Sequence, residues 1–134
     1  MRAIDYVILY VGDLDASVRF YRDVLGLPFS DRMETYAEFR LANLKLGLYD
    51  RAHLPELIGR EGSETRAPAS EIVFLVEDVD AEGERLGAAG VEILSGPVDR
   101  PWGHRTLHVA DPDGHVVEIA QEIPGAPEPR LRSS

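Results

Sequence analysis

The sequence has no cysteine, no long apolar run and no excess of positive charge, and each absence excludes a class of protein. Without cysteine in its 134 residues, the chain cannot form disulfides, thiolate zinc sites or iron–sulfur clusters, and it has no cysteine nucleophile. No apolar run reaches the roughly 18–20 residues of a membrane span, and the N-terminus lacks the apolar stretch of a signal peptide. We therefore expect a cytoplasmic protein that has no membrane partner.

The charge balance is acidic, with 24 Asp and Glu residues against 14 Lys and Arg residues and a formal net charge of −10. Such a chain repels a phosphate backbone, so we expect no nucleic-acid partner. The same field can attract a cationic ligand or simply keep the protein in solution, and composition leaves both open. A content of 44% hydrophobic and 28% charged residues is typical of a globular protein, and the length suits a single domain over 1–134.

Two segments of the chain repeat each other without gaps, Tyr6–Ala16 and Glu71–Ala81. In each copy a run of β-branched and aromatic residues predicts a strand, at about 4–11 and 71–77. An aspartate that can cap a helix follows each strand, and the helices are expected at about 14–25 and 79–89. Four identical pairs support the alignment: Val11/Val76, Asp13/Asp78, Asp15/Asp80 and Ala16/Ala81.

Further strands are expected after the glycine that closes each helix, so the chain predicts an α+β fold of two tandem βαβββ modules. The modules span 1–52 and 68–122, with a linker over 53–67 that has room for one helical turn, and a tail over 124–134 that we expect to be frayed. The sequence Asp111–Gly114 has the chemistry of a hairpin turn. The six further strands are expected at 28–33, 36–41, 44–49, 92–94, 105–110 and 116–121.

Three motifs carry a resemblance to a known family: Asp13–Pro28, Pro101–Gly103 and Asp111–Glu118. They resemble the vicinal-oxygen-chelate superfamily, whose members include glyoxalase I, extradiol dioxygenases and bleomycin-resistance binding proteins. The resemblance implies that each module curls into an open half-barrel sheet around a cleft, and that the protein is a homodimer. It also places the family's four metal-ligand positions on Tyr6, Gly47, Glu71 and Glu118.

Two of these four positions have lost a good ligand, because glycine offers none and a protonated phenol is a poor one. Glu71 and Glu118 can hold Mg²⁺, Mn²⁺ or Ca²⁺, but two carboxylates alone make a poor zinc or ferrous site. We therefore expect no metal cofactor; the alternative is a divalent metal on Glu71, Glu118 and His108.

The alternation of strand side chains places Tyr6, Glu71 and His108 on the cleft side of their strands. His108 can ligate a metal, act as a base or donate a hydrogen bond, whereas His104 and His115 are expected to be solvated or to stabilise a turn. Without a metal, Glu118 needs hydrogen-bond donors or a proton. It can then serve in acid–base chemistry or bind a cationic ligand, or it is simply held by hydrogen bonds from Tyr6 or Arg105.

Aromatic side chains complete the expected site. Trp102 is either a wall for a planar ligand or a lid on the core of its own module, and Tyr49 lies next to a vacated ligand position. We expect a protein of the bleomycin-resistance type that binds a cationic or aromatic small molecule and catalyses no reaction; the alternative is a divalent-metal-dependent lyase, isomerase or dioxygenase. The expected ligand-binding residues are Tyr6, Tyr49, Glu71, Trp102, His108 and Glu118.

Overall fold

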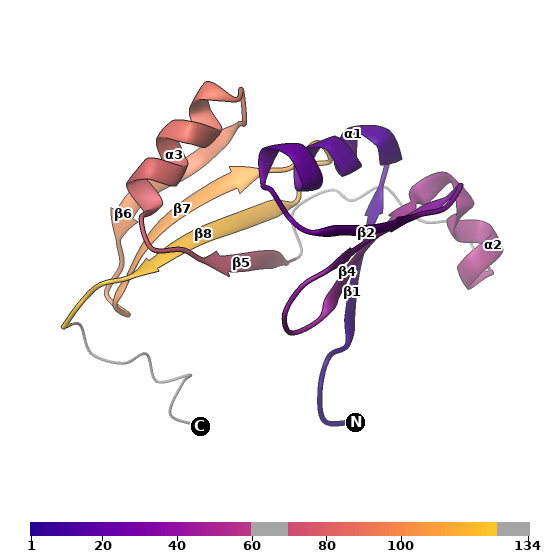
Figure 1. Ribbon diagram of the computed structural model, residues 1–134, viewed down its shortest axis with the longest axis horizontal. Helices are drawn as coiled ribbons and strands as arrows, with labels where there is room; N and C mark the ends of the chain where they lie inside the picture. The colour runs from indigo at the N-terminus through magenta and orange to yellow at the C-terminus, as the bar shows by residue number, and fades with distance from the viewer. Residues whose placement is uncertain (60–69, 126–134) are drawn as a thin grey trace. The chain divides into compact units, whose positions relative to one another are not determined.

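The computed structural model describes residues 1–59 and 70–125, which belong to two compact units, Met1–Arg66 and Ala67–Ser134. Each unit has a four-stranded mixed sheet that stays open, together with a few helices (Figure 1). The expected α+β class is confirmed. Within the described ranges, no helix has the length and apolar character needed to cross a membrane.

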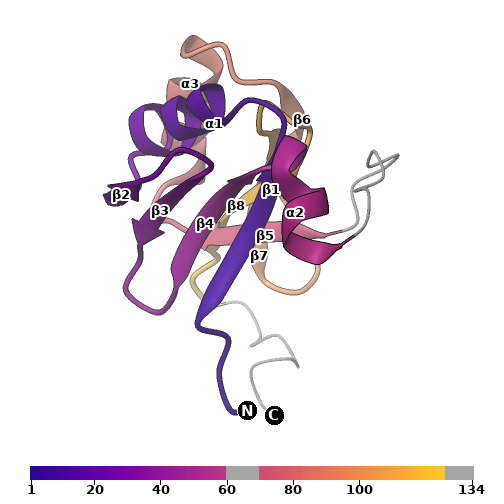
Figure 2. The same ribbon diagram turned by 90° about the vertical axis from the view of Figure 1, so that its right-hand side faces the viewer.

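The first unit has the strand order β1-β4-β3-β2, in which β1 runs parallel to β4 and the other pairs are antiparallel. Figure 2 shows β1 at the edge of this sheet, beside β4. The elements are β1 (Tyr6–Val11), α1 (Leu14–Val18), a π-helical segment (Arg19–Val24), β2 (Phe29–Arg32), β3 (Tyr36–Arg40), β4 (Lys45–Asp50), a 3₁₀ turn (Arg51–His53) and α2 (Leu54–Ile58).

The second unit repeats this topology with the order β5-β8-β7-β6, and β5 runs parallel to β8. The parallel pair needs a crossover connection, which α3 and the strands after it provide. The elements are β5 (Glu71–Leu75), α3 (Val79–Ala88), β6 (Ile93–Asp99), β7 (His104–Ala110) and β8 (Val116–Glu122).

The predicted helix starts and ends are confirmed in both units. The side chain of Asp13 accepts from the backbone N–H of Ala16 at 3.0 Å, and Asp78 accepts from Ala81 at 3.1 Å. Gly26 and Gly90 follow the helices with φ of 78° and 83°, a conformation that costs glycine little. The helix boundaries could therefore be predicted from the capping aspartates and the closing glycines.

The first helix differs from the expected α-helix, because its second half is π-helical. The N–H of Leu25 bonds to the carbonyl of Phe20 at 2.9 Å, one residue further than in an α-helix. Phe20 and Tyr21 are both buried, with their rings 5.0 Å apart and nearly perpendicular. We attribute the wider turn to these adjacent rings, which both pack into the core.

The strands lie where expected, with bounds that shift by one or two residues except at β6. That strand continues to Asp99 rather than ending near Leu94, because it keeps pairing with β7 through two register shifts. In the expected linker, α2 forms the helical turn. Residues 60–69 and 126–134, which hold most of the linker and of the tail, lie outside the described residues.

The alternation of faces is observed on the first strand of each unit. Along β1 exposure alternates and ends at fully buried Val11, while Tyr6, Ile8 and Tyr10 are exposed. Along β5, Glu71, Val73 and Leu75 are exposed and the two residues between them are partly covered. One face of each sheet therefore packs on its own unit's helix, and the other carries the candidate functional side chains.

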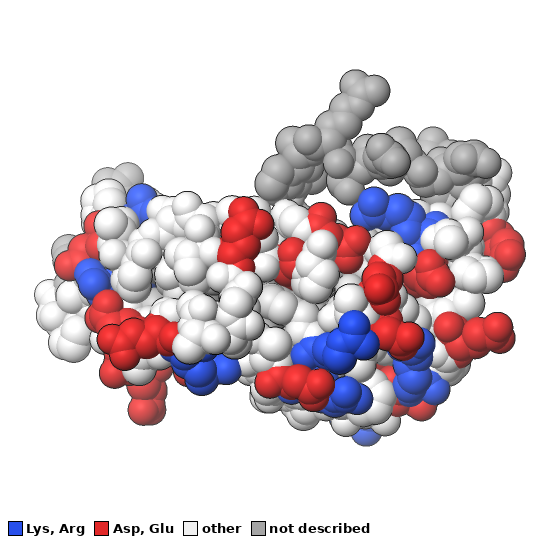
Figure 3. Space-filling view, turned by 90° about the horizontal axis from the view of Figure 1, so that it is seen from above, with Lys and Arg blue, Asp and Glu red and all other residues white. Residues whose placement is uncertain are grey.

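Acidic and basic side chains interleave on the face shown in Figure 3, where red and blue side chains lie next to each other. Ion pairs within the units include Arg32 with Asp15 at 2.9 Å and Arg85 with Glu82 at 2.7 Å.

Removing the cap of α3 tests the inference that aspartate sets the start of the helix. Asp78→Ala should lower the free energy of unfolding by about 1 kcal/mol, because the N–H of Ala81 loses its acceptor. Urea denaturation measures this, with Glu84→Ala on the exposed side of α3 as the control. Equal stability of the two variants would show that the cap contributes nothing.

Candidate functional site

The second unit brings an imidazole and two carboxylates together on its sheet. His108 on β7 lies opposite Glu118 on β8, and its Nε2 is 2.8 Å from Glu118 Oε1. Glu71 at the start of β5 places its Oε2 3.5 Å from the same nitrogen. The side chains are 9% exposed for Glu118, 17% for His108 and 43% for Glu71, so the cluster is open to solvent from the Glu71 side.

The position of the proton on His108 follows from its surroundings. Both polar atoms near Nε2 are carboxylate oxygens, at 2.8 and 3.5 Å, so a hydrogen on Nε2 is favoured over a lone pair at this position. Nδ1 is buried and has no hydrogen-bond partner among the described residues. Nδ1 is more stable with a lone pair than with a hydrogen, because a buried N–H without an acceptor costs about 1–3 kcal/mol. We therefore assign the neutral Nε2–H tautomer, in which Nδ1 is bare.

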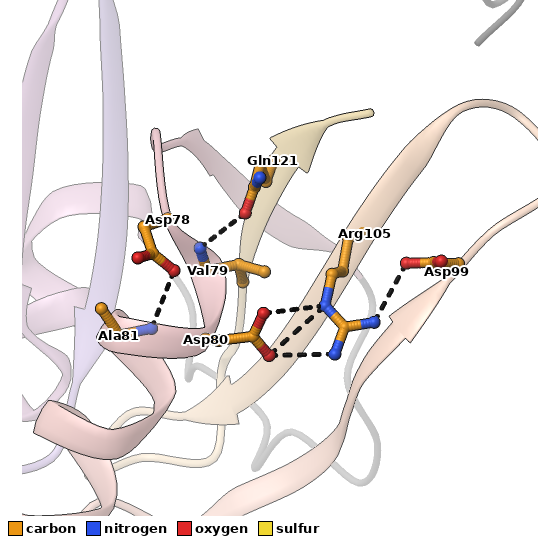
Figure 4. Close-up of polar contacts among 7 residues, drawn as sticks. All are labelled: Asp78, Val79, Asp80, Ala81, Asp99, Arg105 and Gln121. Atoms are coloured by element: carbon orange, nitrogen blue, oxygen red, sulfur yellow. Dashed lines mark hydrogen bonds and ion pairs between the residues drawn. The ribbon is translucent and has the colours of Figure 1, made fainter. Parts of the chain in front are cut away.

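Arg105 does not hold Glu118, so that expectation is wrong. Its guanidinium bonds both carboxylate oxygens of Asp80, at 2.9 to 3.3 Å, and it reaches Asp99 at 3.0 Å (Figure 4). These carboxylates raise the pKa of Arg105, and the guanidinium lowers the pKa of Asp80. Strand parity explains the error, because Arg105 shares the helix-facing side of β7 with buried Leu107, whereas His108 lies on the other side.

Tyr6 belongs to the first unit, where its hydroxyl accepts a hydrogen bond from Lys45 Nζ at 3.1 Å. The same ammonium lies 5.0 Å from the centre of the Tyr6 ring, in cation–π contact. Sequence reasoning missed this pair, although the two residues are directly opposite across β1 and β4. The phenol that takes a ligand position thus interacts with a fixed positive charge.

The two remaining expected residues are Tyr49, on β4, and Trp102, in a turn. The hydroxyl of Tyr49 donates to the carbonyl of His53 at 3.2 Å, so this half-buried side chain fastens the chain after β4. Trp102 lies in the turn between β6 and β7 and is 47% exposed, which does not fit a lid on its own core. Its role as a ligand wall stays a prediction.

His115 stabilises a turn, as expected. Its Nδ1 lies 2.7 Å from Asp111 Oδ2, and the other oxygen of Asp111 accepts from the N–H groups of Asp113 and His115. Asp111, Asp113 and His115 have the spacing of metal ligands, but their polar atoms build the hairpin between β7 and β8. This group therefore explains local structure rather than function.

The sequence matches a family model described as the glyoxalase/bleomycin resistance protein/dioxygenase superfamily over residues 3–119. The chain belongs to this superfamily. It is 38% identical over 118 residues to the uncharacterised protein YraH of Bacillus subtilis, covering 83% of this chain and 91% of that protein. It is 28% identical over 121 residues to the metallothiol transferase FosB of Staphylococcus haemolyticus, covering 89% and 83%.

Solved structures agree with this assignment. A glyoxalase/bleomycin resistance protein/dioxygenase from Nocardioides superposes with a TM-score of 0.81 at 30% identity, covering 94% of this chain and 87% of that one. The resemblance drawn from the three sequence motifs is therefore confirmed for the superfamily and for its fold.

Some members of the superfamily use a divalent metal, and one cluster here has the spacing for it. The ligand atoms of Glu71, His108 and Glu118 all lie within 4.8 Å of one another. To bind a metal through Nε2, however, His108 must move its proton to Nδ1. That atom is buried without an acceptor in the described part of the chain, whereas metal-binding histidines almost always donate their second N–H to one. The cluster meets the distance requirement but fits a metal poorly.

The ligand position at Gly47 is occupied by a neighbouring ring. A Cβ atom at this position would lie 2.6 Å from both Cε1 and the hydroxyl of Tyr36, so no side chain fits without moving the tyrosine. The Tyr36 hydroxyl donates to Glu38 Oε1 at 2.9 Å on the same face of β3. The sequence showed that the ligand at position 47 is missing, but we did not predict that the Tyr36 ring takes its place. The feature that could have indicated it is a tyrosine and a glutamate two residues apart on the neighbouring strand.

The Tyr36–Glu38 pair has a clear electrostatic effect. Burial and the hydrogen bond to Glu38 raise the pKa of Tyr36 to about 12, because both disfavour the phenolate. Tyr36 is therefore a neutral hydrogen-bond donor throughout the physiological range.

Substitution of Gly47 tests the close approach of Tyr36. Gly47→Ala should lower the free energy of unfolding by about 1–2 kcal/mol, because the ring must leave its place over the strand and lose Glu38. The cost should vanish when Tyr36→Ala is the background, as a double-mutant cycle will show. Gly87→Ala in α3, where an added Cβ meets nothing within 4 Å, is the control and should be neutral or stabilising.

The raised pKa of Tyr36 predicts a loss of stability at alkaline pH. The unfolded chain releases this proton near pH 10 and the folded chain only near pH 12, so the folded state holds more protons between these values and its stability falls as pH rises. Tyr36→Phe should flatten this decline in urea midpoints measured across the interval, and Tyr10→Phe should not. An unchanged slope in Tyr36→Phe would contradict the assignment.

Proposed function

We propose that this superfamily member binds a small organic molecule without a metal, through the cluster of Glu71, His108 and Glu118 in the second unit. The observation that carries the proposal is the surroundings of the His108 ring. Because carboxylate oxygens lie next to Nε2 and Nδ1 has no acceptor among the described residues, we infer that the imidazole keeps its hydrogen on Nε2, toward Glu118. The Glu118 carboxylate then keeps unused acceptor positions.

The charge of the cluster defines the class of ligand. Two carboxylates face one imidazole in this partly desolvated site, where a positively charged group would be attracted strongly. A cationic group with several N–H donors, such as an amine or an amidine, can bond Glu71 at the exposed side and reach Glu118. A planar aromatic carrier additionally suits the exposed Val73, which shares the strand face of Glu71.

The first unit supports a site without metal in an independent way. Tyr36 covers Gly47, and Tyr6 interacts with the ammonium of Lys45. Neither family ligand position of the first unit therefore offers a good metal ligand, because one is covered by the Tyr36 ring and the other holds a phenol that accepts from Lys45.

A second candidate is a divalent-metal-dependent enzyme of the same superfamily. It is favoured by the three ligand atoms within 4.8 Å and by the relationship to FosB, whose name describes a metallothiol transferase. In that case Glu71 and Glu118 would hold the ion, and His108 would need an acceptor for its displaced proton.

Thermal unfolding separates the two candidates. Benzamidine, an aromatic cation, should raise the midpoint of the wild type more than its neutral analogue benzamide, and Glu118→Gln should abolish the difference because the buried carboxylate loses its charge. Asp113→Asn, which removes a carboxylate from the hairpin turn, is the control and should keep the difference.

The same protein, purified without chelators, is tested for metal. The proposal expects less than stoichiometric metal and a small shift of the midpoint with Mn²⁺. Stoichiometric metal, or a large Mn²⁺ stabilisation that Glu71→Gln removes, would support the enzyme instead.

A further inference from the structure

The first unit has a pocket that the cluster in the second unit does not involve. It opens where β1 begins and where the hairpin between β3 and β4 turns, and its volume is about 430 Å³. The hairpin is closed by the N–H of Leu41, which bonds to the carbonyl of Leu44 at 2.9 Å. The pocket is lined by Asp5, Tyr6, Arg40, Asn43, Lys45 and two hairpin leucines.

Two cationic side chains line this pocket, and neither forms an ion pair with the described residues. Lys45 is the single lysine of the chain. Its ammonium donates to the Tyr6 hydroxyl and has further N–H donors to offer, and Arg40 adds an exposed guanidinium. By contrast, Arg22, Arg85 and Arg105 all form ion pairs with carboxylates.

The local charge favours an anion in spite of the acidic chain. Among the residues that line the pocket, Asp5 is the one carboxylate against two cations. Glu38 lies on the same strand as Arg40, but its carboxylate already accepts from Tyr36. At physiological ionic strength, salt largely screens charges that lie more than roughly 8 Å away. The charged groups in the pocket therefore dominate the potential that a bound ion meets.

We propose that this pocket binds a small oxyanion, a carboxylate or a phosphate ester, on an apolar or aromatic carrier. Arg40 offers a planar fork that matches two oxygens of such a group, and Lys45 offers a point charge. The Asn43 amide adds N–H donors at the hairpin. The exposed Tyr6 ring and the two leucines contact the apolar part.

The site is distinct in its chemistry from the carboxylate cluster of Glu71 and Glu118, because it selects the opposite charge. It does not rest on the proposed function, since a metal bound in the second unit would leave these side chains unchanged. Lys45, directly opposite Tyr6 on β4, thus places a cation beside this position that an anionic ligand can use.

The single lysine makes the site directly measurable. An amine-specific N-hydroxysuccinimide ester will acylate Lys45 and the N-terminal amine, and peptide mass spectrometry follows the two rates separately. Benzoate or phenyl phosphate should slow acylation of Lys45 but not of the N-terminal amine, and neutral benzamide should slow neither. Protection by one of the two anions alone would identify which oxyanion the site prefers.

Variants locate the protection in the pocket. Arg40→Gln should raise the anion concentration needed for half-maximal protection of Lys45 by about tenfold, because a charge-assisted hydrogen bond is lost. Arg19→Gln, an exposed residue of the π-helical segment with the same change in net charge, should leave it unchanged. Equal protection of both amines, protection by benzamide, or no effect of Arg40→Gln would overturn the proposal.

If Lys45 resists acylation, amide chemical shifts of Tyr6 and Asn43 during titration with the same probes give the same comparison. Shifts with the anions that Arg40→Gln reduces support the site, and the absence of shifts contradicts it.

Discussion

The register between β7 and β8 determines which side chains form the proposed site. It places His108 directly opposite Glu118, so that one nitrogen and one carboxylate oxygen meet at 2.8 Å. Because a strand alternates its faces, a slip by one residue would send His108 to the helix side and leave Glu118 without its imidazole neighbour. The hairpin turn at Asp111 and His115 fixes this register through hydrogen bonds from backbone and side chain. The hairpin turn thus determines that His108 and Glu118 lie next to each other.

The two units have specialised in different directions from a common βαβββ plan. In the second unit the ligand positions keep carboxylates, and His108 has joined them. In the first unit one position lies beneath Tyr36, and the other presents a phenol bonded to Lys45. Membership of a superfamily that includes metal-dependent proteins therefore does not decide the chemistry of this chain, because equivalent strand positions carry carboxylates in one unit and a phenol and a glycine in the other.

Local chemistry predicted most of the fold from the sequence. Asp13 and Asp78 cap their helices, and the alternation of β1 and β5 assigns the exposed faces, because these features depend on neighbours in the chain. The contacts of Lys45 and Tyr36 were missed, since they depend on which strands pair and in what register. The alternative in which Arg105 holds Glu118 is wrong for a different reason. Strand parity places Arg105 on the helix side of β7, away from the side that carries His108.

The proposed function requires that His108 keep its hydrogen on Nε2, toward Glu118, and bind no metal. The ¹⁵N chemical shifts of its ring nitrogens, measured by NMR at neutral pH, test this directly, because protonated and bare nitrogens have well-separated shifts. We predict a protonated Nε2 and a bare Nδ1 that stay unchanged when Zn²⁺ is added. A protonated Nδ1, or a Zn²⁺-dependent shift of Nε2, would contradict the account.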